Sequence, residues 1–218
     1  MKEHIAIDGP AGAGKSTVAQ KLAWCLKYLY LDTGALYRAV TLYFWENHIP
    51  FEDSENLSSL LTQIKIKVSW EDKFRVFLDD REVTEDIRQP EVDALVSPVA
   101  KIKEVRDYLR SVQREIALSR PSVTEGRDIG TVILPDADLK VFLTARPEIR
   151  AYRRWKERKN EGNNIDYKMV LKNVLMRDFI DSTRDDAPLQ KAEDAIEIDT
   201  SFLSIDEVLE KLYKLVEN

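Results

Sequence analysis

The sequence contains little cysteine, histidine, glycine or proline. Its 218 residues include 1 Cys, 2 His, 7 Gly and 8 Pro. A single cysteine, Cys25, excludes an internal disulfide framework and a cysteine-rich zinc site. The low Gly and Pro content, beside 44% hydrophobic residues, excludes collagen-like, low-complexity and fully disordered chains. We therefore expect a folded chain that is long enough to bury a core of its own.

Long apolar runs are also missing from the chain. No run approaches the roughly 18 residues that a membrane-spanning helix requires, so we expect no membrane partner. The first ten residues, MKEHIAIDGP, lack the apolar centre of a secretory signal peptide. Together with the single cysteine, these features predict a soluble protein of a reducing compartment, the cytoplasm.

The net charge gives no broad basic surface. The chain has 33 Lys and Arg against 39 Asp and Glu, a formal net charge of −6, so we expect no nucleic-acid partner. Basic residues nevertheless gather in one short stretch: Arg146, Arg150, Arg153, Arg154, Lys156, Arg158 and Lys159. Such a cluster indicates a site for a small anion, and a solvated helix face is the alternative.

Strand-like and helix-like patterns alternate along most of the chain. Short apolar runs predict strands at 5–8, 28–31, 122–124, 140–143 and 195–199. Apolar residues at helical spacing predict helices at 16–26, 36–44, 147–160, 166–184 and 204–216. This alternation predicts an α/β fold with a three-layer core, in which helices cover both faces of a parallel sheet.

The middle of the chain follows a different pattern. Apolar and polar residues alternate strictly from Ile64 to Trp70, which is typical of a half-solvated antiparallel strand. Turn residues separate this run from further strands predicted at 74–78 and 82–84. We therefore predict a small antiparallel insert at about 62–88, followed by helices near 90–99 and 101–118.

A phosphate-binding loop stands between the first predicted strand and the first predicted helix. The segment GPAGAGKST supplies Gly9, Ala11, Gly12, Ala13, Gly14, Lys15, Ser16 and Thr17. Its spacing matches the P-loop pattern in the required strand–loop–helix context. Glycines let main-chain N–H groups surround phosphate oxygens at a helix N-terminus, the lysine neutralises phosphate charge, and the serine hydroxyl can ligate Mg²⁺. The alternative is a glycine-rich turn without a ligand.

Three further segments carry polar residues that suit a second phosphate and its attached group. Thr33 and Arg38 lie at the start of the second predicted helix, where an ordinary helix cap is the alternative. Glu125, Arg127 and Asp128 follow the third predicted parallel strand, and ligands of such sheets bind at the carboxyl ends of the strands. Glu125 could hold Mg²⁺ through water, and an ordinary polar loop is the alternative for this segment. The third segment carries Arg177, Asp181 and Arg184, whose spacing places them on one helix face. Ion pairing within that helix is the alternative to ligand binding.

Together these segments resemble the bacterial-type cytidylate kinase family. The resemblance is carried by GPAGAGKST, LDTGALYR, EGRDIGT and RDFIDSTRDDAPL, at residues 9–17, 31–38, 125–131 and 177–189, and runs from about residue 5 to 216. Thr33 stands where that family often has serine, and Glu125 where it frequently has aspartate. Both positions keep the chemistry, a hydroxyl and a carboxylate.

The resemblance implies a role for each of these residues. Arg38, Arg127 and Arg184 would grip the acceptor phosphate. Ser97, Arg106 and Asp128 would recognise cytosine, and Arg177 and Asp181 would hold the sugar. The transferring group would be contacted by Lys15, Arg127, Arg184 and a lid arginine, Arg154. Arg150 and Arg158 would bind ATP. The metal would be held by Ser16 and Glu125.

The resemblance also implies the activity and the domain organisation. ATP with Mg²⁺ would phosphorylate CMP and dCMP, without a general base, in a monomer. The chain would form one kinase unit, with a core at 1–35 and 119–218, an acceptor-binding region at 36–118 and a helical lid at 146–165. Kinases of shikimate or dephospho-coenzyme A, and a nucleotide-dependent regulatory protein without an acceptor, remain as alternatives at this stage.

Overall fold

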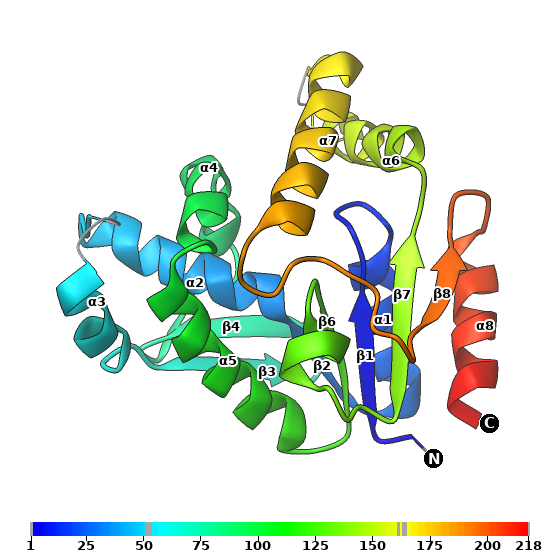
Figure 1. Cartoon of the computed structure of the whole chain (residues 1–218), viewed down its shortest axis with the longest axis horizontal. Coiled ribbons are helices and arrows are strands. Elements are labelled where there is room, and N and C mark those ends of the chain that lie inside the picture. Colours follow the sequence, from blue (N-terminus) through cyan, green and yellow to red (C-terminus); the bar gives the residue numbers. More distant parts are fainter. Residues whose placement is uncertain (1, 51–53, 161, 163–164, 218) are drawn as a thin grey trace. The chain divides into compact units, whose positions relative to one another are not determined.

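The computed structural model describes residues 2–50, 54–160, 162 and 165–217, which form two compact units (Figure 1). Residues 1–28 and 123–218 make up the first unit, and residues 29–122 make up the second. The boundaries predicted for the acceptor-binding region and the lid stay predictions. Of the predicted lid, Glu161, Asn163 and Asn164 lie outside the described residues.

The first unit alternates strands and helices. In chain order it contains β1 (His4–Asp8), α1 (Lys15–Leu26), β6 (Ser122–Gly126), a π-helical turn (Ile129–Ile133), β7 (Leu139–Thr144), α6 (Pro147–Asn160), α7 (Tyr167–Thr183), β8 (Ile196–Asp199) and α8 (Ile205–Glu217). Ile5, Ala6 and Ile7 of β1 have no exposed surface. A strand so buried on both faces belongs to the interior of a parallel sheet.

The parallel sheet has five strands in the order β2-β6-β1-β7-β8. β7 pairs with β1 in parallel register, Ile5 opposite Leu139, and β8 pairs with β7, Val141 opposite Ile196. Helices α1 and α8 pack together, and α6 packs against α7. The predicted α/β class, with helices flanking a parallel sheet, is confirmed.

The second unit contains the predicted antiparallel insert. Its elements are β2 (Leu29–Asp32), α2 (Thr33–Glu46), α3 (Ser54–Leu61), β3 (Ile66–Trp70), β4 (Phe74–Leu78), β5 (Arg81–Glu82), a 3-10 turn (Asp86–Arg88), α4 (Pro90–Val99) and α5 (Lys103–Leu118). Strands β3, β4 and β5 form an antiparallel sheet of their own. The buried Tyr30 ring lies 5.2 Å from the Trp70 ring and 5.1 Å from the Phe74 ring, measured between centroids.

The predicted elements differ from the observed ones at a few places. The third strand of the insert was expected at 82–84 but ends at Glu82. The hydroxyl of Thr84 accepts the Val76 N–H at 3.1 Å, in place of a main-chain carbonyl of a continuing strand. Helix α7 ends at Thr183, and Arg184 has extended backbone. The helix α3 and the π-helical turn at 129–133 were not anticipated.

In the described part of the chain, none of the helices is both long and apolar enough to cross a membrane. The predicted helical lid corresponds to α6, which is joined to α7 by a small apolar cluster. Ala151 of α6 and Val170 and Val174 of α7 are its buried members, and Trp155 packs against them. This cluster holds the basic helix α6 along α7.

Candidate active site

The phosphate loop leaves β1 at Asp8 and enters α1 at Lys15, as the sequence pattern predicts. Gly14 forms the N-cap of α1 with a φ of 92°. Side chains from outside the loop hold its carbonyl groups, since Arg150 Nη1 donates to Ala11 O at 3.1 Å and Thr200 Oγ1 donates to Ala13 O at 3.0 Å. With the carbonyl groups held in this way, main-chain N–H groups are available to an anion at the helix N-terminus.

Lys15 is buried at the centre of this loop. Its Nζ donates to Pro10 O at 3.0 Å, and the residue is only 5% exposed. Burial, together with the positive charge of Arg127, lowers the pKa of Lys15 to about 7, against the opposing effect of Glu125, Asp8 and Asp181. A phosphate group that bound here would supply the anionic partner that favours the charged ammonium.

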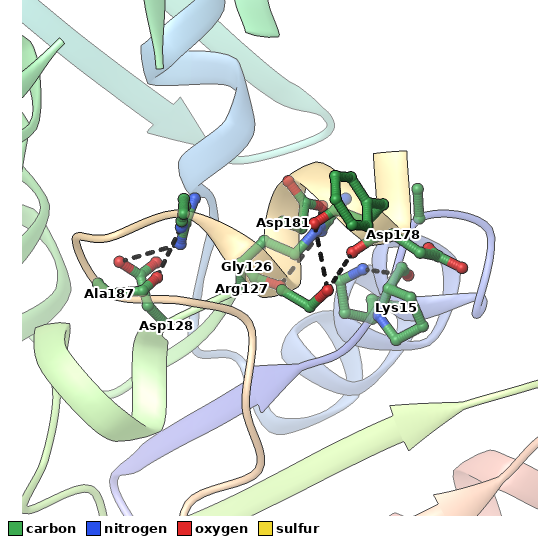
Figure 2. Close-up of polar contacts among 12 residues, drawn as sticks. Lys15, Gly126, Arg127, Asp128, Asp178, Asp181 and Ala187 are labelled. Atoms are coloured by element: carbon green, nitrogen blue, oxygen red, sulfur yellow. Dashed lines mark hydrogen bonds and ion pairs between the residues drawn. The ribbon is translucent and has the colours of Figure 1, made fainter. Parts of the chain in front are cut away.

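Glu125 lies in β6, the neighbour of β1 in the sheet, and Arg127 comes directly after that strand. Glu125 is 3% exposed. Arg127 donates from Nε to Asp181 Oδ2 at 2.8 Å, a pair drawn in Figure 2. Burial alone would lower the pKa of Arg127, but the ion pair with Asp181 outweighs it, and the pKa is raised. The predicted phosphate ligand Arg127 and the predicted sugar ligand Asp181 are therefore direct partners.

Asp128 and Arg184 also lie together. Asp128 is 7% exposed, and its Oδ2 is 3.6 Å from Arg184 Nη2. Arg184 Nε donates to the carbonyl of Ala187 at 2.6 Å. Figure 2 shows Asp128 and Ala187 on adjacent segments of this site. The structure thus brings a residue predicted to read the base into contact with one predicted to bind the phosphate.

Asp8 is a buried carboxylate that the sequence analysis did not select. It is 5% exposed and accepts hydrogen bonds from the main-chain nitrogens of Ile129 at 2.8 Å and Gly130 at 2.7 Å. Burial raises its pKa to about 6, although the two hydrogen bonds oppose that rise. The available signal was a single acidic residue at the end of an apolar strand, immediately before the phosphate loop.

The arginines of α6 do not all have the surroundings expected of a lid. Arg150 is 3% exposed, and its guanidinium binds both carboxylate oxygens of Asp178 as well as Ala145 O and Ala11 O. Arg153 donates to Thr200 Oγ1 at 3.1 Å and to Thr200 O at 2.6 Å. Arg154 and Arg158, the other arginines of α6 predicted to act on ATP and the transferring group, are partly buried. Part of the basic cluster therefore holds the phosphate loop, Arg150 directly through Ala11 O and Arg153 through Thr200.

Four predicted acceptor residues lie in the second unit. Thr33 is buried as the first residue of α2, and the preceding Asp32 caps that helix by accepting the Ala35 N–H. Arg38 donates to Asp93 Oδ1 at 2.6 Å and to Ile87 O at 3.3 Å. Arg106 is 1% exposed, with its guanidinium carbon 6.0 Å from the centre of the Tyr37 ring. Ser97, on α4, is partly buried.

The oxygen groups available for a metal suit magnesium that is carried by a nucleotide. Ser16 is exposed at the start of α1, and Glu125 is a buried carboxylate near the end of β6. Among residues 2–50, 54–160, 162 and 165–217, no group of three or more His, Cys, Asp or Glu could hold a metal ion. Mg²⁺ bound with substrate phosphates needs only one or two protein ligands, because it keeps several waters.

Comparison with known proteins agrees with this arrangement. The model of the cytidylate kinase family matches residues 5–218, which is nearly the whole chain. The chain belongs to the cytidylate kinase family. A cytidylate kinase of Carboxydothermus hydrogenoformans is 50% identical over 98% of this chain and 96% of its own length. One from Thermosipho melanesiensis is 50% identical over 99% of this chain and 97% of its own length.

The fold is also found in a solved structure of low sequence similarity. The match to an uncharacterized protein of Eubacterium ventriosum covers 98% of this chain and 98% of that protein's chain, with a TM-score of 0.50 and 16% sequence identity. At that identity the likeness shows the fold alone. Membership of the cytidylate kinase family therefore rests on the family model and on the relatives that are 50% identical to this chain.

Proposed function

We propose that this member of the cytidylate kinase family transfers the γ-phosphoryl group of ATP to CMP, and also to dCMP. The proposal follows from membership of the family and from the cytidylate kinases that the chain resembles. The observation that carries it in the structure is the group of buried and partly buried charges beside the phosphate loop. Lys15 follows the loop that leaves β1, and Glu125, Arg127 and Asp128 lie in or just beyond the end of the neighbouring strand β6. Lys15, Glu125 and Asp128 are buried and Arg127 is partly buried, at the strand ends where α/β sheets bind ligands.

The first unit would hold the donor and the transferring group. In this proposal the loop from Gly9 to Thr17 surrounds the ATP phosphates, and Lys15 carries positive charge to them. Mg²⁺, when bound with ATP through Ser16 and the water-mediated carboxylate of Glu125, supplies further neutralisation of phosphate charge. Arg154 and Arg158 of α6 remain the proposed lid arginines, while the partners of Arg150 support a role in holding the loop.

The acceptor needs positioning more than activation. The attacking group is an oxygen of the CMP phosphate, which is already ionised, so no general base is required. Arg38, Arg127 and Arg184 would bind this phosphate, and alignment plus charge neutralisation would lower the barrier. Arg177 and Asp181 would hold the sugar, and Ser97, Arg106 and Asp128 would contact cytosine.

A coupled assay of nucleoside diphosphate formation tests the proposal. The purified full chain with ATP and Mg²⁺ should turn over CMP and dCMP much faster than UMP, AMP, GMP or shikimate. Preference for shikimate would assign the chain to another kinase activity. ATP hydrolysis at a rate that no monophosphate changes would instead support a nucleotide-dependent regulator. Sedimentation of the same preparation tests the expected monomer.

A further inference from the structure

The carboxylate of Asp8 connects two segments that lie far apart in the sequence. Asp8 is the last residue of β1 and is followed at once by the phosphate loop. Its Oδ1 accepts the Ile129 N–H and its Oδ2 accepts the Gly130 N–H, at 2.8 and 2.7 Å. Ile129 and Gly130 come directly after Arg127 and Asp128. One buried side chain therefore attaches the end of β1 to the main chain beside both of these residues.

The segment held by Asp8 is the start of a helical turn. Asp128 is the N-cap of the π-helical turn Ile129–Ile133, and its carbonyl accepts the N–H groups of Val132 and Ile133. The first N–H groups of any helix have no partner within the helix, and both first residues of this one are buried. Asp8 supplies their acceptors. Without them the turn would bury two unpaired donors, or it would have to move.

The turn has little freedom to move. A Cβ atom added at Gly130 would lie 3.2 Å from Lys140 Cδ and 3.4 Å from Asp8 Oδ2. Lys140 is itself held, because its Nζ lies 2.8 Å from Asp194 Oδ2. Gly130 is therefore packed closely between the lysine stem and the Asp8 carboxylate. A shift of the turn would also move Asp128, whose own carbonyl is part of the turn.

We propose that Asp8 is a positioning residue for recognition of the acceptor base, because its two hydrogen bonds set the main chain that carries Asp128. The inference rests on the proposed function, in which Asp128 reads cytosine. Two adjacent N–H donors require two acceptors, which an aspartate offers. An asparagine offers one acceptor and would point its own N–H₂ group at the other donor.

The test is Asp8→Asn, assayed with CMP and with UMP. We expect the CMP-to-UMP ratio of kcat/KM to fall about fivefold or more, mainly through loss on CMP, as for one buried hydrogen bond replaced by an unmatched pair. Asp138→Asn is the matched control. Asp138 Oδ2 accepts the N–H groups of Glu3 and His4 at 2.9 Å each, at the other end of β1. The CMP-to-UMP ratio of kcat/KM for Asp138→Asn should stay near that of the wild type.

Amide exchange gives a second measurement that does not depend on turnover. The Ile129 and Gly130 amides should exchange slowly in the wild type and faster in folded Asp8→Asn. If that variant does not fold, Gly130→Ala takes its place, because it keeps Asp8 but presses on the turn, and its ratio should also fall. A wild-type ratio in every folded variant of this turn would overturn the inference. A wild type without activity on CMP would refute the proposed function, and the exchange measurement would still decide whether Asp8 holds the turn.

Discussion

Arg150 of α6 donates a hydrogen bond from Nη1 to the carbonyl oxygen of Ala11 in the phosphate loop, over 3.1 Å. The same guanidinium forms two hydrogen bonds with the carboxylate of Asp178 on α7. Arg150 thereby joins the loop to α6, which carries the basic cluster, and to α7. Since a guanidinium is planar with five donors, it can serve the carbonyl and the carboxylate together.

Arg150→Ala should destabilise the protein and weaken the phosphate loop. Removing one partner of a buried ion pair costs about 3–5 kcal/mol in other proteins; Asp178 is partly exposed here, so we expect the lower part of that range. Urea denaturation measures this loss. The KM for ATP should also rise, because Ala11 O loses its donor. Lys156→Ala, an exposed change on the same helix, is the control. Equal stability of the two variants would contradict this role of Arg150.

Gly9→Ala should prevent correct formation of the phosphate loop. Gly9 has a φ of +145°, and a Cβ built there would lie 1.9 Å from the carbonyl oxygen of Leu143. Because that neighbour is main chain of β7, no side-chain movement can relieve the overlap. Gly162→Ala is the matched control, with a φ of +83° and, apart from its chain neighbours, no atom of the described residues within 4 Å of the added Cβ.

Thermal unfolding of both glycine variants gives the comparison. The control should lose about 1 kcal/mol, the usual size of strain from a side chain at positive φ, and keep its activity. Gly9→Ala should lose several times more or fail to accumulate as folded protein. Similar melting temperatures for the two variants would show that β7 can yield at Leu143.

Lys15→Met should stabilise the folded protein below pH 7 while it removes activity. Burial lowers the folded-state pKa of Lys15 to about 7, from an ordinary value of 10.5. Between these values the unfolded chain binds the extra proton, so the free energy of unfolding rises with pH in the wild type. Below pH 7 the destabilisation caused by the buried ammonium is complete. The substitution should therefore raise the free energy of unfolding by on the order of a few kcal/mol at pH 6, and by less toward pH 10.

Denaturation without nucleotide at pH 6, 8 and 10 measures this dependence. Lys156→Met removes a lysine from an exposed position and should give a small difference that does not change with pH. A gain for Lys15→Met that was the same at all three pH values would show that its ammonium is not the origin of the effect.

Asp128 and Arg184 should show coupled effects in a double-mutant cycle. A carboxylate suits the amino group of cytosine and repels the oxygen of uracil, so Asp128→Ala should lower the CMP-to-UMP ratio of kcat/KM by about 10-fold or more. Arg184→Ala should lower kcat/KM for both substrates. Because the two side chains lie 3.6 Å apart, the double variant should lose less than the sum of the single losses. Strict additivity in kcat/KM for CMP would contradict a functional pair.

Local pattern was sufficient for much of this protein. The strand at 5–8, the helix at 147–160 and the antiparallel run at 64–70 were predicted within two residues of their observed bounds. Their signals are periodicities of neighbouring residues, which follow from the geometry of a single helix or strand. The phosphate loop was readable for the same reason, since its ligand groups are consecutive main-chain N–H groups. The individual site residues remain predictions.

The tertiary structure decided which polar groups became partners. Periodicity could not show that Asp8 binds amides 121 and 122 residues away, or that Arg150 turns inward to Ala11 and Asp178. Such pairings depend on the order β2-β6-β1-β7-β8 of the sheet and on which buried donors and acceptors remain once the strands have paired. A buried polar group must take a partner from whatever segment lies beside it, and that segment is set by the fold rather than by neighbours in the sequence.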